Sequence, residues 1–352
     1  MFLSGFGTAV PATVYPQSAG WAAVQSAPVF PLLTPRSQAL LRKVLMGSNG
    51  IESRHLALDS LSDAFSVSPD IMQARFLKHA PALATLAAER ALLDAGLEAA
   101  DVDALLIATC TGYLCPGLTS YVSERLGLSS GIQSLDLVGL GCGAAVPTLR
   151  TARSLLAAGG VQSVLCICVE VCSAAFYMDN DPGVLISACL FGDGAAAVVC
   201  TPESRGKRRP VRWHATASRL IPAERDALRF ETRQGLLRNL LTPQVPEVVG
   251  RHVAPLLRDQ LLEAGVRRDD LCEWILHPGG RDVLAALQRS LGLRESDLRH
   301  SARVLREYGN MSSPCVLVAL QAALQDDTPD GWWWLASFGA GFSCHGALLQ
   351  VG

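Results

Sequence analysis

The 352-residue chain has little net charge of either sign, because its 30 Lys and Arg nearly balance its 32 Asp and Glu, for a formal net charge of −2. Such a balance excludes a strong general attraction to nucleic acid or to anionic membranes. No run approaches the roughly 18 apolar residues of a membrane span. The first eleven residues lack the basic start and the long apolar stretch of a signal peptide. We therefore expect a cytoplasmic protein with no membrane span and no nucleic-acid partner.

The sequence also lacks the signatures of nucleotide, disulfide and metal chemistry. It has neither GxGxxG nor a phosphate-binding P-loop. Its eleven cysteines are an odd number scattered mostly through apolar runs, which favours reduced thiols. Cys166, Cys168 and Cys172 lie close together, but no second pair of ligands follows them, so core packing is favoured over a zinc site. We predict no metal.

Apolar residues make up 49% of the chain, which is ample for a large core. Strand-like and helix-like segments alternate, a pattern typical of α/β layers. Helices are predicted at 81–96, with Pro81 near the first turn, and at 119–127, 144–160, 246–265, 281–292 and 313–325, the last with Ser313 as its cap. Strands are predicted at 103–110, 132–138, 161–171 and 272–280. Segment 188–200 is interpreted as two extended pieces around Gly-Asp-Gly, and 332–351 as two strands around a glycine turn.

The two halves of the chain match in outline. Each has a buried strand followed by a loop motif and a helix, then a loop that opens a helix of small residues, then two extended pieces around a glycine turn. We infer a duplicated α/β unit with a boundary near 201–212, dividing the chain into 1–210 and 211–352. Duplication would place corresponding loops of the two halves face to face.

Cys142 lies in GLGCGAA (139–145), between glycines and directly before a predicted helix. The thiolate is the reactive form of cysteine, and the N-terminus of a helix stabilises negative charge. Flanking glycines allow a substrate to approach the backbone. The alternative is a small buried residue in a tightly packed turn, and the spacing alone does not separate the two.

A histidine and an asparagine occupy the matching loops of the second half. His277, in LHPGG, directly follows a predicted strand and is placed to act as a base; the alternative is a histidine satisfied within its loop. Asn310, in YGNMSSP, offers an uncharged amide donor to an oxyanion; the alternative is a helix cap. Each is a weak signal alone, but the three together predict a catalytic centre.

Other residues are assigned to structure. Asp193 in FGDG is interpreted as a turn residue rather than an acid catalyst. Cys344 and His345 are neighbours in a strand and point to opposite faces, so they are not partners. The three tryptophans at 332–334 are interpreted as strand core and packing between layers or subunits.

Five motifs together resemble the chalcone and stilbene synthases, the type III polyketide synthases: GCGAA, LHPGGRDVL, YGNMSSPCVLVAL, LFGDGAAAVV and FGAG. The resemblance runs from about residue 109 to the C-terminus and more loosely over the first hundred residues. It implies a thiolase-like fold of two βαβαβαββ halves in layers αβαβα, working as a homodimer. It implies an acyl-CoA starter and malonyl-CoA as substrates, and no cofactor besides these coenzyme A thioesters.

The resemblance also implies roles for the three residues. An acyl starter is loaded on Cys142, while His277 and Asn310 form the hole for the thioester oxygen and stabilise the enolate left by decarboxylation of malonyl-CoA. His277 would keep Cys142 as a thiolate. Repeated condensation and cyclisation then give a pyrone, resorcinol or phloroglucinol-type product.

Further positions are carried over from the same family. Phe191 matches a gatekeeper phenylalanine between the coenzyme A tunnel and the cavity, with a core phenylalanine as the alternative. Gly279 and Gly280 match backbone that follows the pantetheine arm. The cavity wall is expected to include Thr111, Cys115, Cys172, Ala175 and Ser312, with Cys115 at the place from which a side chain reaches into the partner's cavity.

The sequence departs from the plant enzymes of the family in two respects. Asn239 stands where the plant enzymes have a second gatekeeper phenylalanine. The basic residues for the coenzyme A phosphates are shifted, with Arg42 and Lys43 nearest and Arg54 behind them. These changes favour a microbial-type enzyme with an aliphatic acyl-CoA or malonyl-CoA itself as starter.

Three other functions remain open from the sequence. A ketoacyl synthase III-like enzyme would perform one condensation on an acyl carrier protein, but HPGG argues against it. A papain-like cysteine protease also has Cys, His and Asn in this order, but the flanks of Cys142 lack its signature. A catalytically dead relative that only binds coenzyme A is disfavoured because all three residues are present.

Overall fold

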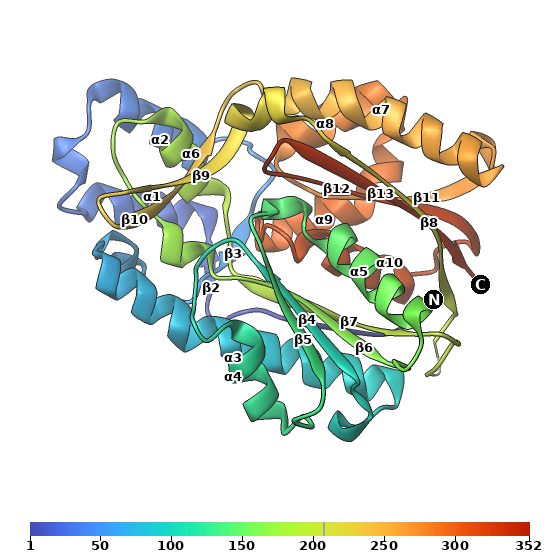
Figure 1. Ribbon diagram of the computed structural model, residues 1–352. Helices are drawn as coiled ribbons and strands as arrows, with labels where there is room; N and C mark the ends of the chain where they lie inside the picture. Colours follow the sequence, from blue (N-terminus) through green and yellow to red (C-terminus); the bar gives the residue numbers. More distant parts are fainter. Residues whose placement is uncertain (207) are drawn as a thin grey trace.

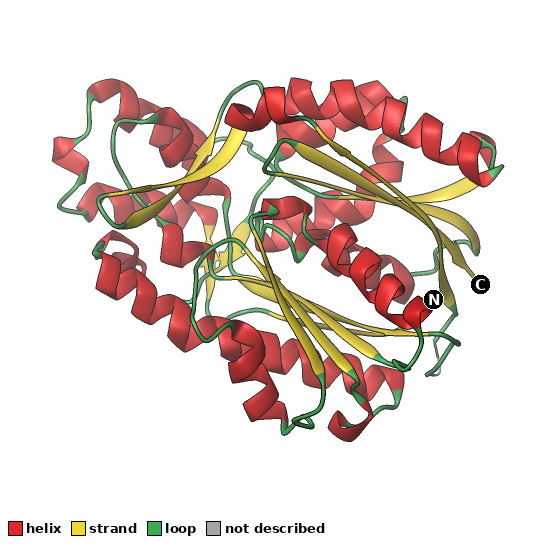
Figure 2. Ribbon diagram, in the orientation of Figure 1, coloured by secondary structure: helices red, strands yellow, loops and turns green. Residues whose placement is uncertain are grey.

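Strands and helices alternate in five layers, helix–sheet–helix–sheet–helix, in a computed structural model that describes residues 1–206 and 208–352 (Figures 1 and 2). Nine of the described strands join in one sheet of order β11-β12-β13-β8-β1-β7-β6-β4-β5. Its two arms form the two sheet layers. The predicted layered α/β architecture is confirmed.

One arm of the sheet comes from the first half of the chain. Its strands are β1 (Phe2–Ala9), β4 (Ala104–Thr109), β5 (Gln133–Val138), β6 (Val164–Glu170) and β7 (Gly194–Thr201). β4 lies parallel to β5 and β6, whereas β7 lies antiparallel to β6 and β1. β4, β6 and β7 are buried throughout, as expected for runs of apolar residues covered on both faces.

The other arm repeats this arrangement with the second half of the chain. Its strands are β8 (Val211–Leu220), β11 (Leu271–Leu276), β12 (Gly331–Gly339) and β13 (Ser343–Val351). β11 lies parallel to β12, and β13 lies antiparallel to β12 and β8. The arms meet where β1 pairs with β8 at Phe2 and Arg212. The predicted boundary near 210 falls between β7 and β8, and the division into two domains stays a prediction.

Helices fill the remaining three layers (Figure 1). α3 (Pro69–Ala95) and α4 (Leu118–Leu126) cover the first arm, and α7 (Val245–Ala264) and α8 (Arg281–Leu291) cover the second. Between the arms lie α5 (Ala145–Ala158) and α10 (Cys315–Gln325), whose apolar side chains share one core with both arms. Trp333 and Trp334 of β12 are fully buried, as predicted for strand core.

α9 (Arg299–Tyr308) packs beside α10 (Figure 1). The remaining helices α1 (Gln17–Ser26), α2 (Pro35–Met46) and α6 (Pro182–Leu190) form a group at one end of the molecule (Figure 1). The short strands are β2 (Val14–Pro16), β3 (Ser53–His55), β9 (Leu228–Arg233) and β10 (Leu236–Leu241). β9 and β10 form a hairpin that is separate from the main sheet. Among the described residues, no helix is long and apolar enough to cross a membrane.

Three details of the predicted helices and strands were wrong. α3 begins at Pro69, where Ser68 caps it, so Pro81 lies inside a longer helix. The segment before Phe191 belongs to α6, whose N-terminus is capped by Asp181, and not to an extended piece. The hydroxyl of Ser313 donates to Glu170 Oε1 at 2.7 Å instead of capping α10.

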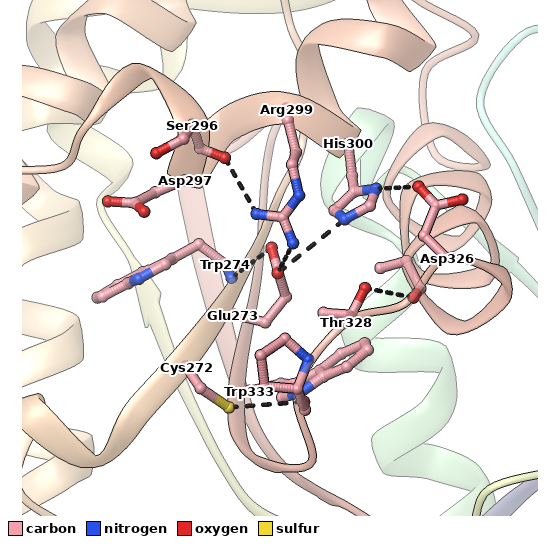
Figure 3. A network of polar contacts seen from close by, with 12 residues as sticks. Cys272, Glu273, Trp274, Ser296, Asp297, Arg299, His300, Asp326, Thr328 and Trp333 are labelled. Atoms are coloured by element: carbon pink, nitrogen blue, oxygen red, sulfur yellow. Dashed lines mark hydrogen bonds and ion pairs between the residues drawn. The ribbon is translucent and has the colours of Figure 1, made fainter.

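A buried polar network holds β11, the strand that leads to His277 (Figure 3). The carboxylate of Glu273, which is fully buried, pairs with Arg299 and accepts a hydrogen bond from the Trp274 amide at 3.1 Å. At the other end of the strand, Ser301 Oγ accepts a hydrogen bond from the Leu276 amide at 3.1 Å. Arg299 and Ser301 both belong to the helix α9. Because each contacts one end of β11, α9 fixes where this strand ends.

Candidate active site

Cys142 lies in a single 3₁₀ turn, Gly141–Gly143, that leads into α5, so the predicted position at the N-terminus of a helix is confirmed. Its side chain is buried. The turn packs backbone to backbone against the FGAG loop, because a Cβ on Gly339 would lie 2.5 Å from the Gly143 amide nitrogen and still closer to Leu140 O. A glycine at 339 is therefore required for this close approach.

His277 directly follows β11 and is buried. Its amide donates to Ala336 O at 2.9 Å, which continues the pairing of β11 with β12. Its Nδ1 has no hydrogen-bond partner among the described residues. An imidazole nitrogen that is buried without a partner is costly unless a ligand completes it, so His277 is suited to a substrate-contacting role.

Asn310 connects the histidine loop with Phe191. Its backbone forms a β-bridge with Phe191, and its Nδ2 donates to Gly279 O at 3.0 Å. Its Oδ1 accepts a hydrogen bond from the Ser312 amide at 2.8 Å. The amide group carries two N–H donors, so one remains for a substrate oxygen. Because these contacts orient the side chain, Asn310 is more than a helix cap.

Ser312 links the asparagine loop to the cysteine. Its Oγ lies 3.2 Å from Cys142 Sγ. The residue has φ of 62° although it is not a glycine. Such a conformation is costly and persists where the surroundings impose it, often at functional sites. Contacts therefore connect the motif loops of both halves, from Cys142 through Ser312 and Asn310 to Gly279.

Glu170 lies behind this group, and the sequence analysis missed it. Its fully buried carboxylate accepts hydrogen bonds from the Cys110 amide at 2.9 Å, Thr111 Oγ1 at 2.9 Å and Ser313 Oγ at 2.7 Å. Burial raises its pKa, although these hydrogen bonds oppose the shift. The sequence held a signal, since a lone Glu within the apolar run VLCICVEVC has to find polar partners in the core.

Burial shifts the two titrating groups of the centre in opposite directions. It raises the pKa of the Cys142 thiol to about 12, although the hydrogen bond from Ser312 opposes the shift. It lowers the pKa of the His277 imidazole to about 4. Both shifts favour uncharged groups, whereas the resemblance predicts a thiolate at rest. The thiol proton therefore has to pass to a neighbouring group before the sulfur can attack.

A cavity of about 510 Å³ opens beside this centre. Thr111 lines it as predicted, together with Cys110, Gly141 and the hairpin residues Phe230 and Leu237. Cys172, predicted as cavity wall, packs instead with Cys142 and Phe191 in a buried cluster. In place of the predicted Ala175, the preceding residue Ala174 lines the cavity. Cys115 is exposed.

The three basic residues proposed for coenzyme A separate into two environments. Arg42 and Lys43 are exposed on α2 and line a surface hollow with Trp21 and Met46. Arg54 is 5% exposed, and its Nη1 donates to Ala188 O at 2.8 Å and to Phe191 O at 2.9 Å. Because the guanidinium of Arg54 faces inward, its assignment as a phosphate ligand does not fit the structure.

Three further assignments bear on the chemistry. The Asp193 carboxylate is fully buried and accepts hydrogen bonds from the Ala57 amide at 2.6 Å and from Ser173 Oγ at 2.6 Å, so it stabilises the loop. His345 contacts Ser218, whereas Cys344 packs in another core, so the two neighbours do face opposite ways. Within residues 1–206 and 208–352, no three His, Cys, Asp or Glu side chains are grouped to hold a metal ion.

The chain is similar to known proteins over its whole length. Residues 32–220 match the model of FAE1/Type III polyketide synthase-like protein, and residues 212–351 match chalcone and stilbene synthases, C-terminal domain. A 3,5-dihydroxyphenylacetyl-CoA synthase from Streptomyces toyocaensis is 33% identical over 98% of this chain and 89% of its own. A 1,3,6,8-tetrahydroxynaphthalene synthase from Streptomyces peucetius subsp. caesius is 34% identical over 89% of this chain and 84% of its own.

Among solved structures, the 1,3,6,8-tetrahydroxynaphthalene synthase of Streptomyces coelicolor A3(2) superimposes with a TM-score of 0.88 at 26% identity. The similarity covers 100% of this chain and 99% of that one.

Proposed function

The chain belongs to the type III polyketide synthase family, and from this premise we propose how its own residues carry out the reaction. Members of the family are condensing acyltransferases with the thiolase-like fold, and the relatives named above make phenolic products. The single observation that carries the proposal is the series of hydrogen bonds that joins the three motif loops, from the thiol of Cys142 through Ser312 and Asn310 to Gly279.

Loading of the starter is the first step. His277 accepts the proton of Cys142, and the sulfur attacks the carbonyl carbon of an acyl-CoA. The thioester bond to coenzyme A breaks, and coenzyme A leaves as a thiol that takes up the same proton. The hydroxyl of Ser312, at 3.2 Å from the sulfur, supports the developing thiolate.

Extension is the second step. Malonyl-CoA loses carbon dioxide, and the electron pair of the broken bond remains as an enolate. N–H groups of His277 and Asn310 donate to the enolate oxygen, where the negative charge develops. The enolate carbon then attacks the acyl group on Cys142, which releases the sulfur and lengthens the chain by two carbons. Repetition and cyclisation give a pyrone, resorcinol or phloroglucinol-type product.

The coenzyme A substrates would follow the positions that the resemblance implies. Phe191 would act as the gatekeeper on the way to the nucleophile, and its packing with Cys142 in one buried cluster supports this role. Gly279 and Gly280 offer backbone to the pantetheine arm, and Arg42 with Lys43 offers positive charge to the coenzyme A phosphates. The proposal needs no metal and no cofactor other than coenzyme A thioesters.

A cytoplasmic homodimer is part of the proposal. β5 is an edge strand that exposes Leu135 and Val138, and the neighbouring Tyr113 is 69% exposed. Exposed apolar side chains on a strand edge are suited to a second copy of the chain. Cys115, exposed on the loop after Tyr113, would then lie close to the partner.

Acylation of Cys142 tests the proposal. We expect the wild type to gain the mass of one acyl group after incubation with acetyl-, hexanoyl- or malonyl-CoA, and Cys142→Ala to gain none. Cys344→Ala is the matched control, because Cys344 is another buried thiol that lies in a different core. An acyl adduct that persists in Cys142→Ala would contradict the assignment.

A further inference from the structure

The helix α5, which directly follows the loop of the nucleophile, lacks one hydrogen bond at its start. Its first i→i−4 bond runs from the Thr148 amide to Ala144 O at 3.0 Å. The preceding bond would join residue 147 to Gly143 O, but Pro147 has no N–H to donate. Gly143 is buried and directly follows Cys142. Its carbonyl group therefore needs a donor from outside the helix.

Ser337, near the end of β12, supplies this donor. Its Oγ donates to Gly143 O at 3.0 Å, and the residue is fully buried. Two residues further on, Gly339 approaches the turn of Cys142 so closely that a side chain there would collide with Leu140 O. The strand that carries the hydroxyl is therefore held directly against the turn. The hydrogen bond joins the second half of the chain to the nucleophile of the first half.

The helix α5 lies between the two arms of the sheet and packs against β12 and β13 (Figure 1). In the strand register, Ser337 pairs with His345, and His345 pairs with Ser218. Directly opposed residues of an antiparallel pair share a face. The ring of His345 packs against the turn, since a Cβ on Gly143 would lie 3.2 Å from its Cδ2. Ser218 Oγ accepts a hydrogen bond from Arg150 of α5 at 3.0 Å, so contacts hold the helix at its start and two turns further along.

Gly143 is the flexible point of the turn. Because glycine has no Cβ, local geometry alone does not fix its backbone angles. Without its donor, the buried carbonyl of Gly143 would rotate toward another one. Such a rotation moves Cys142, which is bonded to Gly143, relative to the hydroxyl of Ser312 at 3.2 Å from its sulfur. A misplacement of about 1 Å can lower the rate of an enzyme about 100-fold.

We propose that Ser337 is a positioning residue for the nucleophile. Its hydroxyl replaces the hydrogen bond that Pro147 cannot make, and it thereby fixes the turn that directs the thiol of Cys142 at the carbonyl carbon of the acyl-CoA. Ser337 acts through the backbone of Gly143. The inference rests on the proposed function, in which Cys142 is the nucleophile, and adds to it a residue outside the five motifs.

The rate of acylation of Cys142 tests the inference. Each variant is mixed with hexanoyl-CoA in a single turnover, and the acyl adduct is followed by mass relative to its final amount, so that misfolded protein does not count. In Ser337→Ala, we expect the maximal rate to fall about 10- to 100-fold, because the thiol is misdirected. The acyl-CoA concentration that gives half of this rate should stay unchanged, because the hydroxyl binds protein backbone and not coenzyme A.

Pro147→Ala provides the second comparison. This change restores an N–H at residue 147, which can donate to Gly143 O in place of Ser337. We expect Pro147→Ala alone to acylate within about twofold of the wild type, and the double variant Ser337→Ala/Pro147→Ala within about threefold, because the two changes are coupled through one carbonyl. A purely structural role of Ser337 predicts no such rescue, since the change at residue 147 leaves the packing around residue 337 as it is.

Thr328→Val is the matched control, because it removes another buried hydroxyl that donates to a backbone carbonyl, Ala323 O at 2.7 Å, near the C-terminal end of α10. It should lower Tm and leave the acylation rate unchanged. If Ser337→Ala does not fold, the double variant carries the test with the same expectation. A wild-type rate in Ser337→Ala, a loss that Pro147→Ala does not restore, or an equal loss in Thr328→Val overturns the inference. If the wild type gains no acyl group on Cys142, the proposed function fails instead.

Discussion

At the scale of single residues, burial controls the chemistry of the centre. Cys142, His277 and Asn310 are all at most 5% exposed, so the polar contacts that each of them makes act with little screening by water. The same burial that makes the contacts strong disfavours charge on the thiol and on the imidazole. Charge therefore has to develop in concert with a substrate.

Replacement of Asn310 separates the two chemical steps. In Asn310→Ala, we expect malonyl-CoA decarboxylation to slow on the order of 100- to 1000-fold, because the enolate loses one positioned donor. Loading of Cys142 should fall less. The measurement is carbon dioxide release relative to the burst of acyl-enzyme, with Asn49→Ala in a surface turn as control. Equal losses in both steps would contradict a greater need for the asparagine in decarboxylation than in loading.

Burial of His345 makes stability depend on pH. Burial and, secondarily, Arg150 lower its pKa to about 4 from an ordinary value near 6.5. Between these pH values the unfolded chain binds a proton at His345 that the folded chain does not. The contribution of His345 to the free energy of unfolding is therefore complete above about pH 6.5 and is lost as pH falls toward 4.

The effect of His345 is measured as the difference in unfolding free energy between a variant and the wild type. The difference is needed because burial raises the pKa of Glu170, Asp193 and Glu273, and these carboxyls change the stability with pH in the opposite direction. Relative to the wild type, His345→Gln should gain unfolding free energy as pH falls from 7 to 4.5 in urea titrations. A difference that stays constant over this range would refute the assignment of a lowered pKa.

At the scale of elements, small strands and helices outside the main sheet position the residues of the active site and the wall of the cavity. β3 carries Arg54, whose guanidinium ties α6 and Phe191 together through two carbonyl oxygens. The β9–β10 hairpin forms a wall of the cavity. α9 fixes the end of β11 and thereby His277.

The two basic sites on this side of the molecule should respond differently. Arg54→Met leaves two buried carbonyl groups unpaired and should cost about 2–4 kcal/mol of unfolding free energy. Arg42→Ala, on an exposed helix face, should change stability by less than about 0.5 kcal/mol and raise the KM for malonyl-CoA. Urea unfolding and steady-state kinetics of both variants give the comparison. The reverse pattern would restore Arg54 as a ligand of coenzyme A.

Elements with strong local signals were predictable from the sequence. α7 and α8 have periodic apolar faces and end at glycines in the left-handed conformation. The predicted first and last residues of both helices therefore agree with the structure to within one residue. α3 was predicted too short because Pro81 suggested a first turn, whereas burial of Met72 and Phe76 stabilises the preceding turns.

The β9–β10 hairpin is local, because two residues of positive φ, Gln234 and Gly235, join its strands, and the sequence analysis missed it. The lone Glu170 in an apolar run signals a need for polar partners, but its partners Cys110 and Ser313 come from distant segments that no local pattern identifies.

At the scale of the whole molecule, the repeated halves explain why the motifs work together. Cys142 comes from the half that ends with β7, and His277 and Asn310 come from the half that begins with β8. α5 and α10 lie between the two arms of the sheet, and the loops that precede them meet where Ser312 Oγ contacts Cys142 Sγ. The layered fold therefore assembles one site from two similar units.

Turnover without a carrier protein tests the central claim most directly. The purified chain is incubated with malonyl-CoA alone and with malonyl-CoA plus acetyl- or hexanoyl-CoA, and products are identified by mass. The account predicts cyclised triketides or longer products in the wild type and none in Cys142→Ala. A single condensation that requires an acyl carrier protein, or no product longer than a diketide, would contradict it.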